Sequence, residues 1–274
     1  MNIFKDKIVI VTGAASGIGR ALCEELSRRG AKLVMADRNQ SLLEEAASAI
    51  KNSRGSAKAV PLDVTDFQAV KKMVDDAVAE HGRLDYIFNN AGMIVFAEAR
   101  FFEYSDWTNV INTNLFGVVN GVAAAYPVMV KQGFGHIINT ASAAGVWPMP
   151  GCVSYTASKY GIVGLSHALR IEAEALGVKV SVVCPGFIET PIYEISKMTR
   201  IDRAKFKSAF PKAIRSSAEK CSLEILRGVE KNKATIITTG FARTFAFLHR
   251  MSPGLVRKLL TTSMIRLRQM KNEK

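Results

Sequence analysis

The 274-residue chain lacks the sequence patterns of disulfide-bonded, metal-binding and membrane-spanning proteins. Its four cysteines, Cys23, Cys152, Cys184 and Cys221, show no CxxC pairing and no zinc-like spacing, so we expect free thiols in a reducing compartment and no metal site. No apolar stretch reaches about 18 residues, and the N-terminus shows no signal-peptide pattern. These absences predict a cytoplasmic protein without a membrane-spanning segment.

Acidic residues are scarce near the C-terminus. Residues 1–196 hold 18 Lys and Arg against 19 Asp and Glu, whereas residues 197–274 hold 19 against 5. A basic end of this kind suits an acidic partner, such as an anionic membrane face or a charged substrate. No zinc-finger, RNP-like or helix-turn-helix pattern accompanies it, so we expect no nucleic-acid binding.

The sequence does contain a regular alternation of strand-like and helix-like segments. Six apolar, β-branched runs have the length of strands: 7–12, 32–36, 57–62, 84–88, 136–140 and 179–183. Helix-like segments, the longest at 106–130, separate them. This alternation predicts an α/β fold, a Rossmann-type doubly wound parallel sheet with helices on both faces. We predict a single catalytic domain over residues 1–240, followed by a basic amphipathic helical extension over residues 241–274.

The first strand-like run leads into a glycine turn, TGAASGIG, with glycines at positions 13, 17 and 19. Such a turn between strand and helix lets the backbone approach a pyrophosphate, which then lies at the helix N-terminus. The turn therefore predicts a dinucleotide site.

The end of the second strand indicates which dinucleotide binds. The carboxylate of Asp37 can accept hydrogen bonds from the adenosine ribose hydroxyls and would repel a 2′-phosphate. Arg38 could pair with such a phosphate, but Ser16, inside the glycine turn, supplies no second positive charge. We therefore expect NAD as the preferred cofactor, with NADP as the alternative.

Tyr155 and Lys159 lie four residues apart in the segment YTASK, which places them on one face of a helix. At about 5 Å and an effective dielectric of about 20, an ammonium stabilises a phenolate by about 3 kcal/mol, equivalent to about two pKa units. We therefore predict that Lys159 lowers the pKa of Tyr155 and prepares it for proton transfer near neutral pH.

Further polar residues lie where strands or apolar helices end. Ser142 ends the strand-like stretch HIINTAS, where its hydroxyl could bond a substrate oxygen. Asn114, in NTNLFG, indicates a buried amide within an apolar helix. Asn90 in NNAG and Thr190 in PGFIET follow two further strands.

The motifs TGAASGIG, NNAG, NTNLFG, Ser142, YTASK and PGFIET, in this order and spacing, resemble the classical short-chain dehydrogenase/reductase (SDR) family over residues 5–240. The resemblance implies four catalytic residues: Asn114, Ser142, Tyr155 and Lys159. It also implies a set of cofactor-binding residues: Gly13, Ser16, Gly17, Ile18, Gly19, Asp37, Arg38, Asp63, Val64, Asn90, Ala91, Gly92, Tyr155, Lys159, Pro185, Gly186, Ile188 and Thr190.

The implied reaction is hydride transfer between a hydroxyl-bearing carbon and nicotinamide C4, coupled to proton transfer through Tyr155. Three segments expected at the substrate site, 93–96, 146–150 with Trp147, and the loop from Phe187 to Phe210, are apolar near it. They favour a lipophilic alcohol or ketone, steroid-, retinoid- or fatty-acyl-like, and a role in lipid metabolism. The alternative is a regulatory or scaffold protein that binds the dinucleotide without turnover, which the four filled catalytic positions disfavour.

The C-terminal extension carries eight Lys and Arg against one Glu over residues 241–274. Pro253 and Gly254 can open a helix with apolar residues on one side: Leu255, Val256, Leu259, Leu260, Met264 and Leu267. We expect this helix either to pack within its own assembly or to lie peripherally on an anionic membrane. The family resemblance implies a homo-oligomer, a dimer or a tetramer. The tetramer is less expected, because ATIITTG replaces the DGG-type stretch with which classical members often end their last strand.

Overall fold

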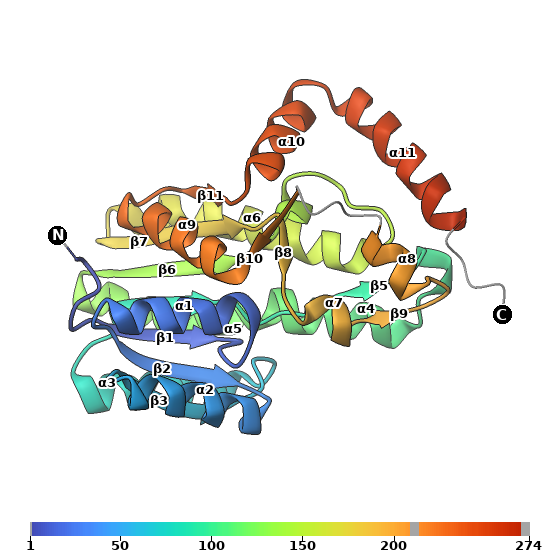
Figure 1. Ribbon diagram of the computed structural model, residues 1–274. Coiled ribbons are helices and arrows are strands. Elements are labelled where there is room, and N and C mark those ends of the chain that lie inside the picture. Colours follow the sequence, from blue (N-terminus) through green and yellow to red (C-terminus); the bar gives the residue numbers. More distant parts are fainter. Residues whose placement is uncertain (1, 209–213, 270–274) are drawn as a thin grey trace.

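The strand-like segments form a seven-stranded parallel sheet in the computed structural model, which describes residues 2–208 and 214–269. The strand order is β11-β7-β6-β4-β1-β2-β3 (Figure 1). The strands have these bounds: β1 Ile8–Thr12, β2 Lys32–Asp37, β3 Ser56–Pro61, β4 Tyr86–Asn89, β6 Gly135–Thr140, β7 Val178–Cys184 and β11 Thr235–Ile237. The predicted doubly wound sheet is confirmed.

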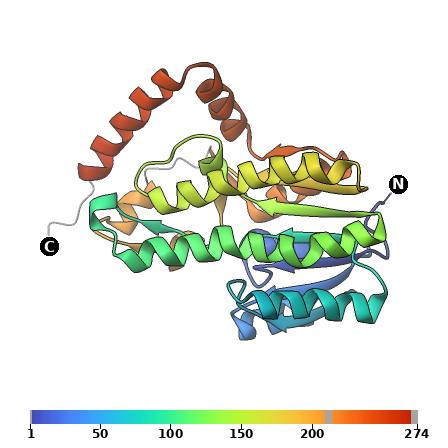
Figure 2. The ribbon, with the colours of Figure 1, turned by 180° about the vertical axis from the view of Figure 1, so that it is seen from behind.

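Helices cover both faces of the sheet. One face, in front in Figure 1, packs against α1 (Gly17–Arg28), α2 (Gln40–Asn52) and α9 (Ala218–Glu230). The other face, in front in Figure 2, packs against α3 (Phe67–His81), α5 (Gly117–Gln132) and α6 (Val153–Glu174). In β1, Val9 and Val11 join the first core and Ile8 and Ile10 the second. Burial on both faces explains why the strands read as continuous apolar runs.

The order in which successive strands join the sheet changes sense between β1 and β4. The chain runs outward from β1 through β2 to β3, then returns to pair β4 with the other edge of β1. At such a reversal the loops after the two strands diverge, which leaves a crevice at the carboxyl ends of the strands. The glycine turn and NNAG, which follow β1 and β4, therefore meet at this crevice.

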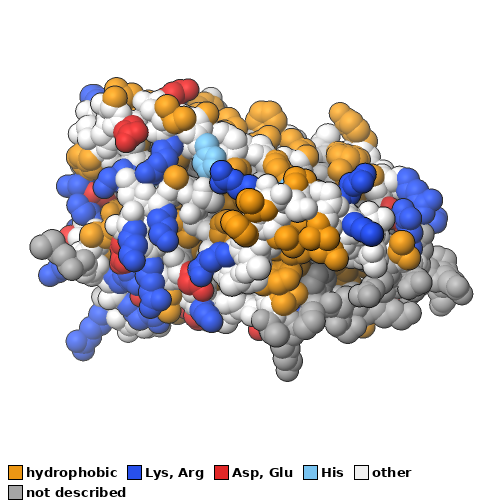
Figure 3. All heavy atoms as spheres, turned by 90° about the horizontal axis from the view of Figure 1, so that it is seen from above, with side chains coloured by type: hydrophobic (Ala, Val, Ile, Leu, Met, Phe, Trp, Pro, Cys, Tyr) orange, Lys and Arg blue, Asp and Glu red, His pale blue; other side chains and the backbone are white. Residues whose placement is uncertain are grey.

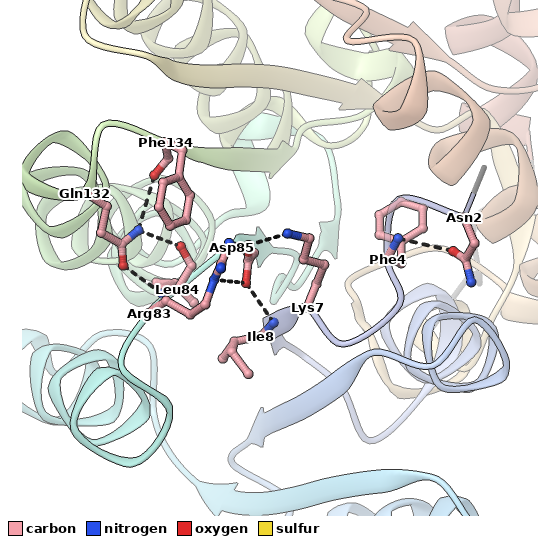
Figure 4. A network of polar contacts seen from close by, with 9 residues as sticks. All are labelled: Asn2, Phe4, Lys7, Ile8, Arg83, Leu84, Asp85, Gln132 and Phe134. Atoms are coloured by element: carbon pink, nitrogen blue, oxygen red, sulfur yellow. Dashed lines mark hydrogen bonds and ion pairs between the residues drawn. The ribbon is translucent and has the colours of Figure 1, made fainter.

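A polar network ties the opposite, amino end of the sheet together (Figure 4). Buried Asp85 accepts hydrogen bonds from the backbone N–H of Ile8 (3.0 Å) and from Arg83 Nε (3.0 Å), and Lys7 Nζ lies 3.3 Å from its Oδ1. Gln132 exchanges two hydrogen bonds with the backbone of Leu84 (2.8 and 2.9 Å). These contacts join β1, β4 and the end of α5, far from the crevice.

The predicted long helix at 106–130 is interrupted. It consists of α4 (Tyr104–Ile111), a π-helical turn (Asn112–Phe116) and α5. Residues 104–132 are long and apolar enough to cross a membrane, so the expectation that no segment has this length and composition is wrong. The stretch nevertheless packs on the sheet through Ala124, Ala125 and Met129, as a core helix of the domain does.

Short elements lie beyond the carboxyl edge of the sheet. β5 (Val95–Phe96) pairs with β9 (Lys197–Met198), and β8 (Phe187–Glu189) pairs with β10 (Arg215–Ser217). Two 3-10 turns, η1 (Ala99–Phe101) and η3 (Ala143–Gly145), and two short helices, α7 (Ile192–Ile195) and α8 (Arg203–Ser208), lie among them. Phe210, the outer limit of the predicted substrate loop, lies outside the described residues.

The last helices, α10 (Gly240–Met251) and α11 (Pro253–Gln269), form an arch above the sheet (Figures 1 and 2). The helix expected to begin at Pro253 is confirmed. The apolar residues expected on one side of this helix fall into two groups. Val256 is buried and Leu260 packs on the domain, whereas Leu255 and Leu259 are exposed. Met264 is half-buried, and the side chain of Leu267 lies outside the described part of the chain.

Candidate active site

The glycine turn lies directly against the loop that follows β4. Gly13 has a positive φ of +66°, and a Cβ at this position would lie 2.8 Å from Ala91 Cα. Because only glycine combines this φ with so close an approach, Gly13 allows the two loops to touch. Gly17, with φ +55°, lies against Thr190 from the PGFIET segment, where a Cβ would be 3.1 Å from the threonine methyl.

Helix α1 points its N-terminus into the crevice. Ser16, its N-cap residue, makes no side-chain cap, and the first turn holds no acidic residue. The backbone N–H groups of this turn, together with the positive end of the helix dipole, suit a pyrophosphate. Ser16, Gly17 and Ile18 line the cavity beside it.

Asp37 is held at the mouth of the same cavity. Its Oδ2 accepts from the backbone N–H of Ala15 (3.1 Å) and its Oδ1 from that of Asn39 (2.9 Å). These bonds hold the Asp37 carboxylate, at the end of β2, against the glycine turn. This is the position from which a carboxylate can bind the adenosine ribose hydroxyls. Arg38 and Asp63 are exposed and also line the cavity, and buried Val64 completes this end.

Thr12, which sequence reasoning did not select, organises the floor of the crevice. Its Oγ1 accepts from the backbone N–H groups of Asn90 (2.9 Å) and Ala91 (3.1 Å), and Asn90 Nδ2 donates to the Thr12 carbonyl (3.1 Å). A hydroxyl at the end of a buried strand needs hydrogen-bond partners. This requirement is the sequence signal that could have identified Thr12 as part of the site.

Tyr155 and Lys159 lie on one face of α6 above the crevice, as predicted. Lys159 is buried, donates from Nζ to the Thr140 carbonyl (2.8 Å), and lies 5.5 Å from the centroid of the Tyr155 ring. Ser142, two residues after β6, lines the same cavity as Tyr155, lowers the pKa of that phenol, and accepts at Oγ from the Ala144 N–H (3.1 Å). The phenol and the serine hydroxyl therefore present one joint site to a substrate oxygen.

The predicted effect of Lys159 on Tyr155 is wrong for the protein alone. Burial raises the pKa of Tyr155, and the influence of the Ser142 hydroxyl lowers it only in part. Burial also lowers the pKa of Lys159 to about 7. The expectation assumed a well-screened pair, but here desolvation penalises both charged forms. The raised pKa leaves the phenol of Tyr155 protonated at neutral pH.

Asn114 lies one layer behind these groups, in the π-helical turn. Its Oδ1 accepts from the Met93 N–H (2.8 Å), and its Nδ2 donates to the Met93 carbonyl (2.9 Å) and to Ser158 Oγ (3.1 Å). The predicted buried amide is thus confirmed, with partners on the loop between β4 and β5 and on α6. Asn114 positions that loop, and Gly92 separates it from Lys159.

Nearly all the predicted site residues line one continuous cavity, from Asp37 at one end to Tyr155 and Ile188 at the other. Pro185, Gly186, Asn90 and Gly92 lie between them. Two residues are set back: Asn114, as described, and Gly19, which packs against the carbonyl of Gly13. Gly19 therefore lets α1 approach its own strand, while the other glycines face the cavity.

The far end of the cavity has an apolar wall. Phe96 packs against Phe206 (ring centroids 4.6 Å apart) and stacks on Tyr193 (6.2 Å), and all three line the cavity with Met149. Tyr155 itself packs against this cluster. Trp147, expected at the substrate site, is instead buried against Phe245 of α10 (5.0 Å), because the 146–150 loop turns its indole toward the arch.

A nicotinamide dinucleotide fits this arrangement. The N-terminus of α1, which has no side-chain cap, suits its pyrophosphate, and Asp37 suits its adenosine ribose. The end of the cavity lined by Tyr155 and Lys159 would hold its nicotinamide half. When bound, such a cofactor supplies or accepts the hydride, a chemistry that side chains cannot supply. Of the chain's own residues, Ser142 would orient a substrate oxygen and Tyr155 would exchange its proton.

Known proteins share this sequence pattern. The family model for short chain dehydrogenase matches residues 7–200. An uncharacterised oxidoreductase of Listeria innocua is 38% identical over 192 residues, which are 69% of this chain and 77% of that protein. A 3-oxoacyl-[acyl-carrier-protein] reductase of Thermotoga maritima is 36% identical over 188 residues, 69% of this chain and 76% of that protein.

A solved structure shares the fold over almost the whole chain. It is a short-chain dehydrogenase/reductase from Burkholderia phymatum in complex with NAD, with a TM-score of 0.84 and 28% identity, covering 92% of this chain and 95% of that one. Sequence, fold and the assembled Ser142–Tyr155–Lys159 site agree. The chain belongs to the short-chain dehydrogenase/reductase family and is an oxidoreductase that uses a nicotinamide cofactor.

Proposed function

We propose that this protein transfers a hydride between NAD(H) and a lipophilic alcohol or ketone, steroid-, retinoid- or fatty-acyl-like. The observation that carries the proposal is the packing of Tyr155 against an apolar cluster that also lines the cavity. A substrate whose carbonyl reaches Ser142 and Tyr155 would place its carbon skeleton against Phe96, Met149 and Phe206, where burial of apolar surface favours binding. The acyl substrate in the name of the Thermotoga maritima relative is of the same general class.

NAD is the preferred cofactor in this proposal, with NADP as the alternative. The carboxylate of Asp37 lines the cavity and would repel a 2′-phosphate. Arg38, exposed beside it, is the residue through which NADP could still bind.

We also propose a cytoplasmic homo-oligomer, a dimer or a tetramer, acting in lipid metabolism. Large apolar side chains exposed on and next to α4 and α6, namely Tyr104, Phe116 and Tyr160, support a subunit contact on that side.

The test is a panel of alcohols and ketones of increasing chain length, with NAD(H) and NADP(H), read by nicotinamide absorbance. We expect kcat/KM to rise with apolar length, and Phe96→Ala to flatten that rise while leaving the dissociation constant of NADH unchanged. Leu42→Ala, a truncation of an exposed apolar residue on α2, is the matched control.

Two results would contradict the proposal. One is a preference for short, polar alcohols, which would place the substrate elsewhere. The other is tight NADH binding without turnover of any compound in the panel, which would favour the scaffold alternative.

A further inference from the structure

The arch formed by α10 and α11 is joined to the domain at both ends. Near its start, Ala242 is buried and Phe245 packs against Trp147. Near its end, Arg268 Nε lies 3.3 Å from Glu98 beside η1. Between these attachments the junction of the two helices stands away from the sheet in both ribbon views (Figures 1 and 2).

Four apolar side chains are exposed around this junction, which we call the elbow (residues 247–259). They recur at every fourth position and have these exposed fractions: Phe247 67%, Met251 67%, Leu255 46% and Leu259 48%. The inward side of α11 is occupied separately, by buried Val256 and by Leu260, which packs on the domain. The exposed set is therefore additional to the side chains that hold the arch in place.

The charges around the elbow are of one sign. Arg250, Arg257 and Lys258 are exposed within it, and no Asp or Glu occurs in the sequence between Glu230 and Glu273. On the face seen from above, hydrophobic side chains gather beside Lys and Arg, and acidic side chains are few there (Figure 3). An apolar projection flanked by cations matches the apolar interior and anionic headgroups of a lipid surface.

We propose that the elbow docks this protein on an anionic lipid surface, inserting Phe247, Met251 and Leu255 while Arg250, Arg257 and Lys258 meet the headgroups. A lipid surface is favoured over a protein partner because the apolar side chains lie on a projection, which a soft surface can surround. A second copy of the chain would have to present a matching hollow.

The first turns of α10, which lead to the elbow, connect to the active site. Phe187 lines the cavity, and its ring centroid lies 6.1 Å from that of Phe241 in α10. Phe241 stacks on Phe245, with ring centroids 5.6 Å apart, and Phe245 contacts Trp147. Docking would therefore place the side of the cavity lined by Phe187 near the bilayer from which a lipophilic substrate enters. This second step rests on the proposed function, whereas the docking itself does not.

The test is co-sedimentation of the full-length protein with phosphatidylcholine vesicles that contain or lack phosphatidylserine. We expect binding to the anionic vesicles that falls as salt rises. Phe247→Ser with Met251→Ser should weaken it at least tenfold, and so should Arg250→Gln with Arg257→Gln and Lys258→Gln. The matched control, Lys51→Gln with Lys71→Gln and Lys72→Gln, removes the same charge from exposed positions on α2 and α3 and should leave binding within about twofold.

NADH binding and the melting temperature of each variant establish that it is folded. Three outcomes would overturn the proposal: no sedimentation of the intact protein, equal loss in the control variant, or a change of oligomeric state in the Phe247→Ser, Met251→Ser variant, which would make the elbow a subunit contact. Stronger binding to nucleic acid than to vesicles would likewise overturn it. Sedimentation requires no substrate, so docking and the proposed activity can fail separately.

Discussion

The ammonium of Lys197 lies 2.9 and 3.1 Å from the two carboxylate oxygens of Asp106, which stands ninety-one positions earlier in the chain. Asp106 is buried in the first turn of α4, and Lys197 belongs to β9, which pairs with β5. Arg203 donates to the carbonyls of Tyr193 and Ser196 in the same loop. These bonds hold the apolar substrate loop over the cavity.

We expect Lys197→Met to loosen this loop, because it leaves the buried carboxylate of Asp106 without its cation. KM for a lipophilic substrate should rise several-fold, while kcat and the dissociation constant of NADH change little. Lys197→Arg, which can restore the ion pair, should recover most of the wild-type KM. Equal KM values for the Met and Arg variants would show that the ion pair does not position the loop.

Tyr155→Phe should lower kcat by about a hundredfold or more, because it removes only the transferable proton. NADH binding, measured by fluorescence, should stay near the wild-type value. Tyr160→Phe removes the same hydroxyl from an exposed tyrosine of α6 and should leave kcat unchanged. Activity of Tyr155→Phe within about tenfold of wild type would contradict the assigned proton donor.

Asp37→Ser should shift the ratio of kcat/KM values from NAD toward NADP, because it removes the charge that repels a 2′-phosphate and leaves Arg38 to meet it. Asp37→Asn keeps an oxygen for the Ala15 N–H and should shift the ratio in the same direction with less loss of NAD binding. An unchanged ratio in both variants would mean that Asp37 does not read the ribose.

His136 should make the protein less stable as the pH falls below about 6.5. Burial, reinforced by the charges of Lys179 and Arg170, lowers the pKa of His136 to about 3. Between these two values the unfolded chain binds a proton that the folded chain does not, so the free energy of unfolding rises with pH. From pH 7 to pH 5 this effect removes about 2 kcal/mol.

Urea titrations at the two pH values measure this loss. His136→Gln should reduce the pH dependence by that amount and can still bond Ser181, whose Oγ lies 2.8 Å from His136 Nε2. His167→Gln, at an exposed position on α6, should keep the wild-type dependence. A His136→Gln titration as steep as the wild type would show that the imidazole is not held neutral.

Motifs with short spacing were the most predictable part of this site. The glycine turn, the four-residue step from Tyr155 to Lys159 and the buried amide of Asn114 are local patterns, and backbone geometry carries them directly into the fold. Thr12 was missed because its partners, Asn90 and Ala91, are seventy-eight and seventy-nine positions away. Trp147 was misplaced because its neighbour Phe245 belongs to a helix that packs from outside the strand–helix alternation.

The sequence by itself determined the family, the parallel sheet and the choice of candidate reacting groups, because apolar periodicity and motif spacing act within a few residues. Only the tertiary structure decided the burial that shifts the pKa values of those groups. Lys159 is buried and Tyr155 is partly buried, and desolvation, which spacing along a helix cannot reveal, raises the pKa of Tyr155 and lowers that of Lys159. It also decided which apolar residues of α11 are free to meet a partner, because contact with Trp147 and its neighbours selects the inward side of the arch.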